Sequence, residues 1–221
     1  MPLLPSFAEL AGTPDPPLDL LTLALAAEFR TVDPRAALVT LDTLGTQLAE
    51  AMARLPGDVA GQVRACADLL GAVHGFSGDR EDYDHPDNSM LDLVLERRRG
   101  LPILLSVVYV EVARRASVPL AGVGLPGHFV VGHFGGPTPV LLDPFNGGVR
   151  IEAEAGAGIV RPWHATEVVM RMLNNLVAGH TRRGDFGLAI RAAQLRLRLP
   201  AGRTLRQTLE LELRSMQARM N

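Results

Sequence analysis

The sequence predicts an α+β fold, in which a helical N-terminal half packs on a small antiparallel sheet and a helical hairpin follows. Three observations predict it. Apolar residues recur at helical spacing over residues 18–116. Short apolar runs separated by Gly and Pro then fill residues 120–151. Helical spacing returns after Pro162. We therefore expect a flexible lead-in (1–17), a core domain (18–160) and a helical tail packed on the core (161–221).

The helical half begins after a Pro-rich segment, 1–17, which predicts the flexible lead-in. Residues 18–52 predict two amphipathic helices with a start signal at Asp33-Pro34 between them. A third helix is predicted from about Asp58 to Val73, after the break at Pro56-Gly57, and it contains Cys66.

A polar, turn-rich loop is predicted over residues 75–89. Ser89 or Asn88 is expected to cap the next helix, which should stop at Arg97-Arg98-Arg99-Gly100. Leu101-Pro102 then opens the most apolar helix of the chain, Ile103 to Ala116. Such a helix should be central and buried.

Four short runs predict the antiparallel sheet: 120–123, 128–133, 140–143 and 149–151. In the tail, Leu176, Ala189 and Pro200 match a degenerate tetratricopeptide hairpin. One such repeat cannot bury its own apolar face, so the tail should pack on the core or on a partner.

Composition limits the function classes. The 221 residues are 47% hydrophobic and 5% aromatic, and the net charge of −2 argues against nucleic acid as a partner. No apolar run is long enough to cross a bilayer and the start lacks signal-peptide features, so we expect a cytoplasmic protein with no membrane partner. The single cysteine, Cys66, agrees with a reducing compartment and excludes a cysteine-based zinc site. The chain has no Lys, which excludes Schiff-base chemistry, and no cofactor is predicted.

The candidate chemistry lies at His128 and Asp143. An apolar helix, a strand that begins with His and a strand that ends in Asp follow one another in the order used by papain-like and transglutaminase-like enzymes. In those enzymes the nucleophilic Cys stands at the N-terminus of the helix, where the helix dipole lowers the pKa of its thiol. Counting back from Val118-Pro119 puts that position at Pro102, which has no nucleophilic atom.

Four motifs in order strengthen the resemblance. They are Tyr83-x-x-Pro86-x-Asn88-Ser89, Leu95-Glu96-Arg97-Arg98-Arg99-Gly100-Leu101-Pro102, Gly122-Val123-Gly124-Leu125-Pro126-Gly127-His128-Phe129 and Asp143-Pro144-Phe145-Asn146-Gly147-Gly148. Over roughly residues 20–200 the chain resembles the SirB-one family, bacterial proteins with a transglutaminase-like core and a tetratricopeptide-like tail. The resemblance implies a catalytic-type histidine at His128, an orienting acid at Asp143 and cleft or motif roles for Tyr83, Asn88, Glu96, Arg97, Arg98, Gly127, Phe129, Phe145 and Asn146.

Two residues could replace the missing thiol. Ser106 lies one helical turn after Pro102 on the same face, but its hydroxyl is expected to bond a backbone carbonyl. Cys66 has the apolar neighbours Ala65 and Ala67 and is expected to be an inert, buried thiol.

Metal and anion sites are weaker alternatives. Candidate ligands are Asp82, Asp84, His85, Asp87, His128 and His133. The loop over residues 75–89, called the acidic loop below, lacks the spacing of an EF-hand. His128 and His133 should point to opposite faces of one strand, so no metal is predicted. The three arginines at 97–99 are explained first by the dipole of the helix that they end.

The sequence thus favours a pseudoenzyme that binds another protein or a peptide through its cleft and helical tail. The alternative is a hydrolase or acyltransferase in which His128 and Asp143 activate water or Ser106. His128 and Asp143 could also serve only to pin two strands together, and the core could be a packing platform in a larger assembly.

Overall fold

The computed structural model describes residues 4–152 and 160–219. Its first half is helical, as predicted. The helical elements are α1 (Phe7–Ala11), α2 (Leu18–Ala27), α3 (Pro34–Met52), α4 (Val59–Cys66), the π-helical η1 (Ala67–Val73), the 3₁₀ turn η2 (Pro86–Ser89), α5 (Leu91–Arg97) and α6 (Pro102–Arg115). Asp33 caps α3 by accepting the N–H groups of Arg35 and Ala36, so the predicted start signal is confirmed.

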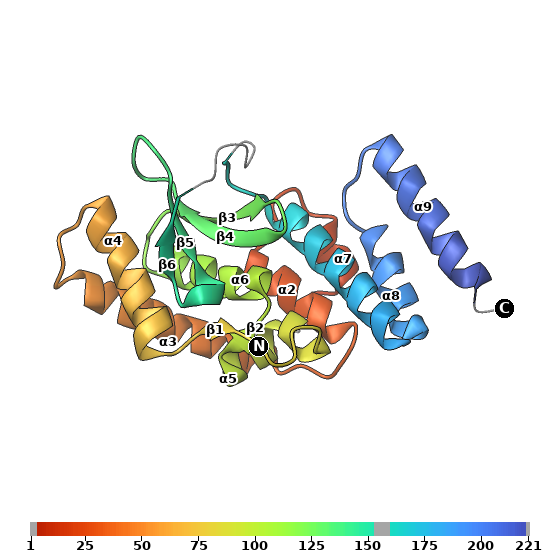
Figure 1. The fold of residues 1–221 in the computed structure, drawn as a ribbon, viewed down its shortest axis with the longest axis horizontal. Coiled ribbons are helices and arrows are strands. Elements are labelled where there is room, and N and C mark those ends of the chain that lie inside the picture. Colours follow the sequence, from red (N-terminus) through yellow and green to blue (C-terminus); the bar gives the residue numbers. More distant parts are fainter. Residues whose placement is uncertain (1–3, 153–159, 220–221) are drawn as a thin grey trace.

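Helix α6 is the centre of the molecule. It is buried along nearly its whole length, from Pro102 to Ala113, as expected for a helix that is apolar all round. The sheet covers one side of α6, and α2, α3 and α5 pack against it from other sides (Figure 1). The N-terminus of α6 is therefore held rigidly beneath the sheet.

The sheet has four antiparallel strands in sequence order: β3 (Leu120–Leu125), β4 (His128–His133), β5 (Val140–Asp143) and β6 (Val149–Ile151). This confirms the predicted fold class. A second, very small sheet was not predicted: β1 (Ser77–Gly78) pairs in parallel with β2 (Arg99–Gly100) and ties the loop after η1 to the end of α5.

The tail forms α7 (Ala165–Arg183), α8 (Phe186–Arg196) and α9 (Arg203–Ala218). Helix α7 packs on the core through Val168, Val169, Met172 and Leu173, and α8 packs on α7. Only Leu209 of α9 is buried, and α9 lies at the end of the molecule opposite α4 (Figure 1). The tail is helical and packs on the core; its likeness to a tetratricopeptide hairpin stays a prediction.

Two local predictions were wrong. The lead-in contains α1, whose Phe7 and Leu10 are buried and whose N-terminus is a capping box between Ser6 and Glu9. Neither Ser89 nor Asn88 caps α5; the cap residue is Met90, without a side-chain bond. The helix ends at Arg97, within the predicted stop of residues 97–100, and Arg98 takes the left-handed conformation at φ 57° as its C-cap.

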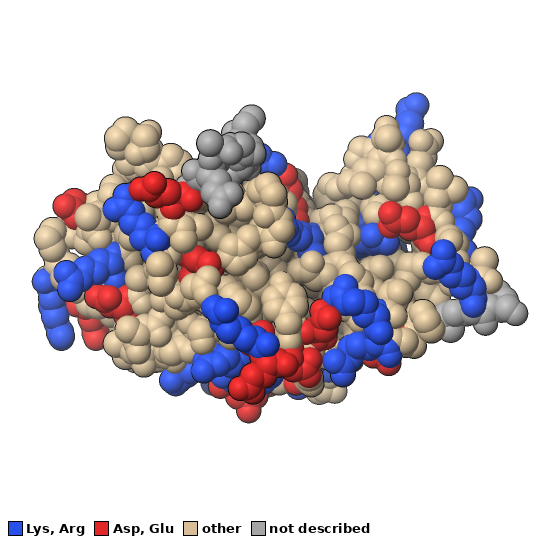
Figure 2. Space-filling model, viewed as in Figure 1, with Lys and Arg blue, Asp and Glu red and all other residues tan. Residues whose placement is uncertain are grey.

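The charged side chains are mixed in sign over the visible face of the molecule (Figure 2). Within the described residues, no helix is long and apolar enough to cross a membrane.

Candidate site around His128 and Asp143

Two neighbouring strands bring His128 and Asp143 together. His128 begins β4 and Asp143 ends β5, and the antiparallel register pairs Val131 with Leu142. Extended past β5, this register places His128 level with the loop that follows Asp143. The Nε2 atom of His128 lies 2.9 Å from Oδ2 of Asp143.

The carboxylate of Asp143 accepts four hydrogen bonds. Besides His128 Nε2, its donors are the amide of Asn146 at 2.6 Å and the backbone N–H groups of Phe145 at 3.0 Å and Asn146 at 3.4 Å. Asp143 is buried, so these bonds replace the water that the carboxylate loses on folding. Because a carboxylate oxygen accepts hydrogen bonds, this contact requires the proton on Nε2 of His128, and in that tautomer Nδ1 is the acceptor nitrogen of the ring.

The loop after Asp143 is held by close backbone packing. It forms the 3₁₀ turn η3 (Pro144–Asn146) and ends at Gly147, which has a φ of 72°. A Cβ atom on Gly71 of η1 would lie 1.9 Å from the carbonyl oxygen of Gly147, so only glycine permits this contact. The π-helical turn thus seats the loop that orients Asp143.

Aromatic contacts cover the exposed side of this loop. The ring of Phe145 packs edge to face on His128 with centroids 6.4 Å apart, and on Tyr83 with centroids 6.0 Å apart. The guanidinium of Arg80 lies 5.3 Å above the Phe145 ring and donates to Asn146. The His128 side chain nevertheless keeps 30% exposure.

The N-terminus of α6, where papain-like enzymes carry their nucleophile, has no nucleophilic side chain. Pro102 is the first residue of α6 and is buried, with Leu101 as the N-cap. Ser106 is fully buried, and its hydroxyl makes no hydrogen bond with any residue that the structure describes, His128 and the expected backbone carbonyl included.

This arrangement of helix, strands and paired side chains agrees with the sequence comparisons. The family profile described as transglutaminase-like superfamily matches residues 35–176, which is most of the chain and includes the site. The chain belongs to the transglutaminase-like superfamily.

Among curated proteins, this transglutaminase-like chain is similar to UPF0162 proteins, in support of the SirB-like resemblance. It is 36% identical to one from Xylella fastidiosa over 143 residues, which cover 57% of this chain and 51% of that protein. It is 31% identical over 138 residues to one from Vibrio cholerae, covering 56% of this chain and 51% of that protein.

A shorter match is to mouse F-box only protein 21, at 41% identity over 71 residues, 32% of this chain and 11% of that protein. The chain thus spans about half the length of the two UPF0162 relatives and much less of the F-box protein. No solved structure matches.

Other predicted motif residues of the transglutaminase-like core hold the acidic loop. Asn88 donates to the carbonyl of Asp82 at 2.8 Å and accepts from Arg97 at 3.3 Å, and Arg97 also bonds Asp79 at 3.2 Å. Arg98 bonds the carbonyl of His74 at 3.0 Å. These side chains pin the loop to α5 rather than reach His128.

The remaining motif residues differ in whether they contact His128 and Asp143. Gly127, with a φ of 69°, makes the tight turn that starts β4 directly before His128. Phe129 is buried against Trp163. Glu96 is exposed and, unlike Phe145 and Asn146, makes no hydrogen bond to the pair.

Metal ligands are not grouped in this site. Across 4–152 and 160–219, no three His, Cys, Asp or Glu residues form a set that could hold a metal ion. His133 faces Gln62 at 2.7 Å instead. Cys66 is fully buried, and its burial raises the pKa of the thiol to about 12.

Two residues beside the site were missed at the sequence level, Arg80 and Arg171. Arg171 of α7 donates to the backbone carbonyl of His128 at 3.0 Å. Its only sequence signal is a basic residue between the apolar positions Val169 and Met172 of a helix, which gives no hint of a contact 43 residues away.

Proposed function

We propose that this transglutaminase-like protein is a non-catalytic binding protein, which recognises a peptide segment of another protein beside His128 and along its helical tail. One observation carries the proposal. The hydrogen-bonded pair of His128 and Asp143 is retained and partly exposed, whereas the helix end that faces papain-type pairs holds Pro102. We expect it to act in the cytoplasm.

The chemistry supports a role in binding. Acyl transfer through a covalent intermediate needs a nucleophilic oxygen or sulfur within hydrogen-bond reach of the base. Pro102 has none, Ser106 makes no hydrogen bond to His128, and the pKa of Cys66 is raised so far that its thiol stays protonated near neutral pH. A histidine held by a buried carboxylate remains well suited to bond a peptide carbonyl or amide.

Turnover assays test the absence of catalysis. A panel of p-nitrophenyl esters and peptide anilides is incubated with the full chain and with His128→Ala. We expect both proteins to give the background rate. An enzymatic rate that disappears in His128→Ala would refute the proposal.

A binding assay tests the proposed recognition of a peptide. Terminally blocked random octapeptides on a membrane are probed with the labelled full chain. We expect a subset of peptides to retain it, and His128→Ala to weaken retention at least about threefold, as the loss of one hydrogen bond predicts. Retention of no peptide, or retention unchanged in His128→Ala, contradicts a peptide-binding role for this cleft.

The second candidate is a hydrolase that uses water. It is favoured by the 30% exposure of His128 and by the engagement of Nε2 with Asp143, which leaves Nδ1 as a general base. The same panel separates the two candidates: a hydrolase releases product in proportion to enzyme, and Asp143→Asn lowers its rate by orders of magnitude through the wrong tautomer. Ser106→Ala leaves the rate of a water-based hydrolase unchanged and abolishes that of a serine-based one.

A further inference from the structure

Two hollows that share Asn175 lie along one face of α7, and together they are called the groove below. Its larger part has a volume of about 520 Å³ and is lined by Trp163, Met170, Arg171, Asn174, Pro200 and Leu205, among others. A smaller hollow of about 110 Å³ adjoins it, lined by Tyr83, His180 and Arg182 among others, and Asn175 lines both. The larger part lies between the body and α9, the lobe at the right-hand end of Figure 2.

The groove suits an extended peptide in length and lining. From Thr166 to Arg182 the helix rises about 24 Å, which about seven extended residues would span. The lining mixes apolar side chains with the amides of Asn174 and Asn175, groups that can bond a peptide backbone.

The smaller hollow contains a buried imidazole, that of His180, which can make hydrogen bonds. His180 is only 3% exposed, and both of its ring nitrogens lack a hydrogen-bond partner among the described residues. Its Nδ1 is 3.6 Å from a carboxylate oxygen of Asp185, too far for a hydrogen bond. A buried polar group of this kind is normally satisfied, by water or by a ligand.

Arg171 stands in the larger part of the groove, beside His128. Its guanidinium lies over two aromatic rings, 5.6 Å from the centroid of Phe129 and 5.9 Å from that of Trp163, and it donates to the carbonyl of His128. These contacts fix the plane of the guanidinium. Because a guanidinium has five N–H donors, others remain for a ligand after the bond to His128 is made. Burial lowers the pKa of this arginine, so a carboxylate beside it would stabilise its charged form.

Five tail arginines pair with a carboxylate: Arg161 with Glu167, Arg182 with Asp84, Arg183 with Asp82, Arg191 with Glu28 and Arg196 with Glu212. Among the described residues Arg198, Arg203 and Arg214 have no such partner either, but they are exposed to water, whereas Arg171 is half-buried over two aromatic rings. No carboxylate of residues 4–152 or 160–219 pairs with Arg171. The nearby Glu167 is already committed, because Arg161 holds the pKa of its carboxyl at about 2.

We propose that this groove binds an acidic peptide and that Arg171 receives the carboxylate of one Asp or Glu side chain. The inference rests on the proposed peptide-binding function and names the class of partner. Among the residues that line the groove, Arg171 is the cation that has no carboxylate partner within the described part of the chain, so it matches one carboxylate of a ligand. Bidentate pairing of a half-buried guanidinium gives the selectivity.

A paired peptide array tests it. Each random, terminally blocked octapeptide is made twice, with Glu or Gln at its fourth position, and probed with the full chain and with Arg171→Gln. Among peptides that bind, we expect the full chain to prefer the Glu form at least about tenfold. Arg171→Gln should lose this preference. A urea unfolding curve that matches that of the unchanged protein shows that the variant is folded.

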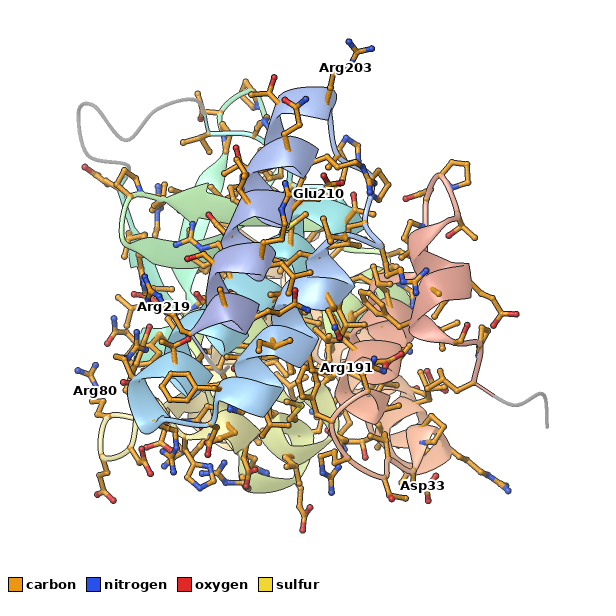
Figure 3. All side chains as sticks on the ribbon, turned by 90° about the vertical axis from the view of Figure 1, so that its right-hand side faces the viewer. Asp33, Arg80, Arg191, Arg203, Glu210 and Arg219 are labelled. Atoms are coloured by element: carbon orange, nitrogen blue, oxygen red, sulfur yellow. The ribbon has the colours of Figure 1, made fainter. Side chains whose placement is uncertain are left out.

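Two further variants separate charge from position. Arg171→Lys keeps the charge without the planar fork and should keep only part of the preference. Arg203→Gln removes the same charge from the end of α9, where the side chain projects away from the body (Figure 3), and should keep the full preference.

The failures are distinguishable. If the full chain binds peptides but does not prefer Glu over Gln, or if Arg171→Gln keeps the preference, the acidic-peptide inference is overturned and the proposed binding function stands. If no peptide of either form is retained, the proposed function itself fails, and the inference fails with it.

Discussion

The two ends of the papain-type site contrast in chemistry. At the strand end, the carboxylate of Asp143 accepts four hydrogen bonds and orients His128. At the helix end, the residues in the corresponding place are the buried Leu101, Pro102 and Ser106, and the Ser106 hydroxyl is unbonded within the part of the chain that the structure describes. At the strand end the polar groups are joined by hydrogen bonds, whereas the helix end consists of buried side chains that pack together.

The contrast separates two roles that active enzymes combine. A histidine and carboxylate pair stabilises the junction of β4, β5 and the following loop whether or not chemistry takes place, because it satisfies buried polar groups. A cysteine at a helix N-terminus contributes reactivity and little to packing. Retention of the first with replacement of the second is the pattern expected of a fold kept for binding.

The largest predicted effect concerns the single thiol of the chain, Cys66, which belongs to neither end. Burial raises the pKa of Cys66 from 9.0 to about 12, so at pH 8 the thiolate fraction should be about a thousandfold lower in the folded protein than in the unfolded one. We expect alkylation by iodoacetamide to be suppressed at least to this extent and restored in urea. Rapid alkylation of the native protein would show that Cys66 is accessible after all.

The same shift has a definite sign for stability. Because the folded pKa lies above the unfolded one, the neutral thiol stabilises the fold fully below pH 9, and this contribution is lost as the pH rises toward 12. The free energy of unfolding of Cys66→Ala should therefore fall less steeply over this range than that of the unchanged protein.

The next effect tests the polar end. Asp143→Ala leaves the donors of His128, Phe145 and Asn146 without their acceptor, and we expect a loss of about 2–4 kcal/mol in the free energy of unfolding, measured in urea. Glu96→Ala removes an exposed carboxylate that does not bond the pair and should change stability by no more than about 0.5 kcal/mol. Equal effects of the two changes would contradict a structural role for the Asp143 network.

A third variant tests whether the helix end can still support reactivity. Pro102→Cys, made together with Cys66→Ala, places a thiol in the first turn of α6, where the helix dipole favours its thiolate. In a papain-type arrangement His128 would favour it further. We expect the pH dependence of alkylation to give a thiol pKa at least about one unit below the ordinary 8.5. Addition of His128→Ala should raise this pKa again.

A thiol pKa above 8.5 in that variant would show the opposite. Burial of Pro102 would then outweigh the dipole, and residue 102 would be a packing position without the geometry of a nucleophile.

The sequence predicted those parts of the fold that local patterns determine. The apolar run of α6 and the alternation in β4 and β5 are local, so they located the elements that carry Pro102, His128 and Asp143. The missed helix α1 also had a local signal, the capping box from Ser6 to Glu9, which the surrounding prolines obscured.

The other misses depend on tertiary contacts. Asn88 does not cap α5, because its amide is engaged by Asp82 and Arg97. Arg171 reaches His128 only because α7 packs beside β4, an arrangement that spacing within α7 does not reveal. Side chains of the proposed peptide site are therefore the part of the molecule that its sequence patterns predict least.

The smallest predicted effect is the change in stability of Ser106→Ala, which tests whether Ser106 only packs in the core or also makes a hydrogen bond. The Ser106 hydroxyl is buried and has no partner among residues 4–152 and 160–219. Its removal relieves the desolvation cost, so Ser106→Ala should leave stability unchanged or raise it by up to about 1 kcal/mol. The matched control is Thr22→Ala, which removes a buried hydroxyl that bonds the carbonyls of Leu18 at 2.8 Å and Asp19 at 3.0 Å and should cost about 1 kcal/mol. Both are read from urea unfolding curves. A loss in Ser106→Ala as large as that in Thr22→Ala would mean that the Ser106 hydroxyl has a hydrogen-bond partner in solution. His128 would then be the first partner to test, because a bond between Ser106 and His128 would make Ser106 a candidate nucleophile.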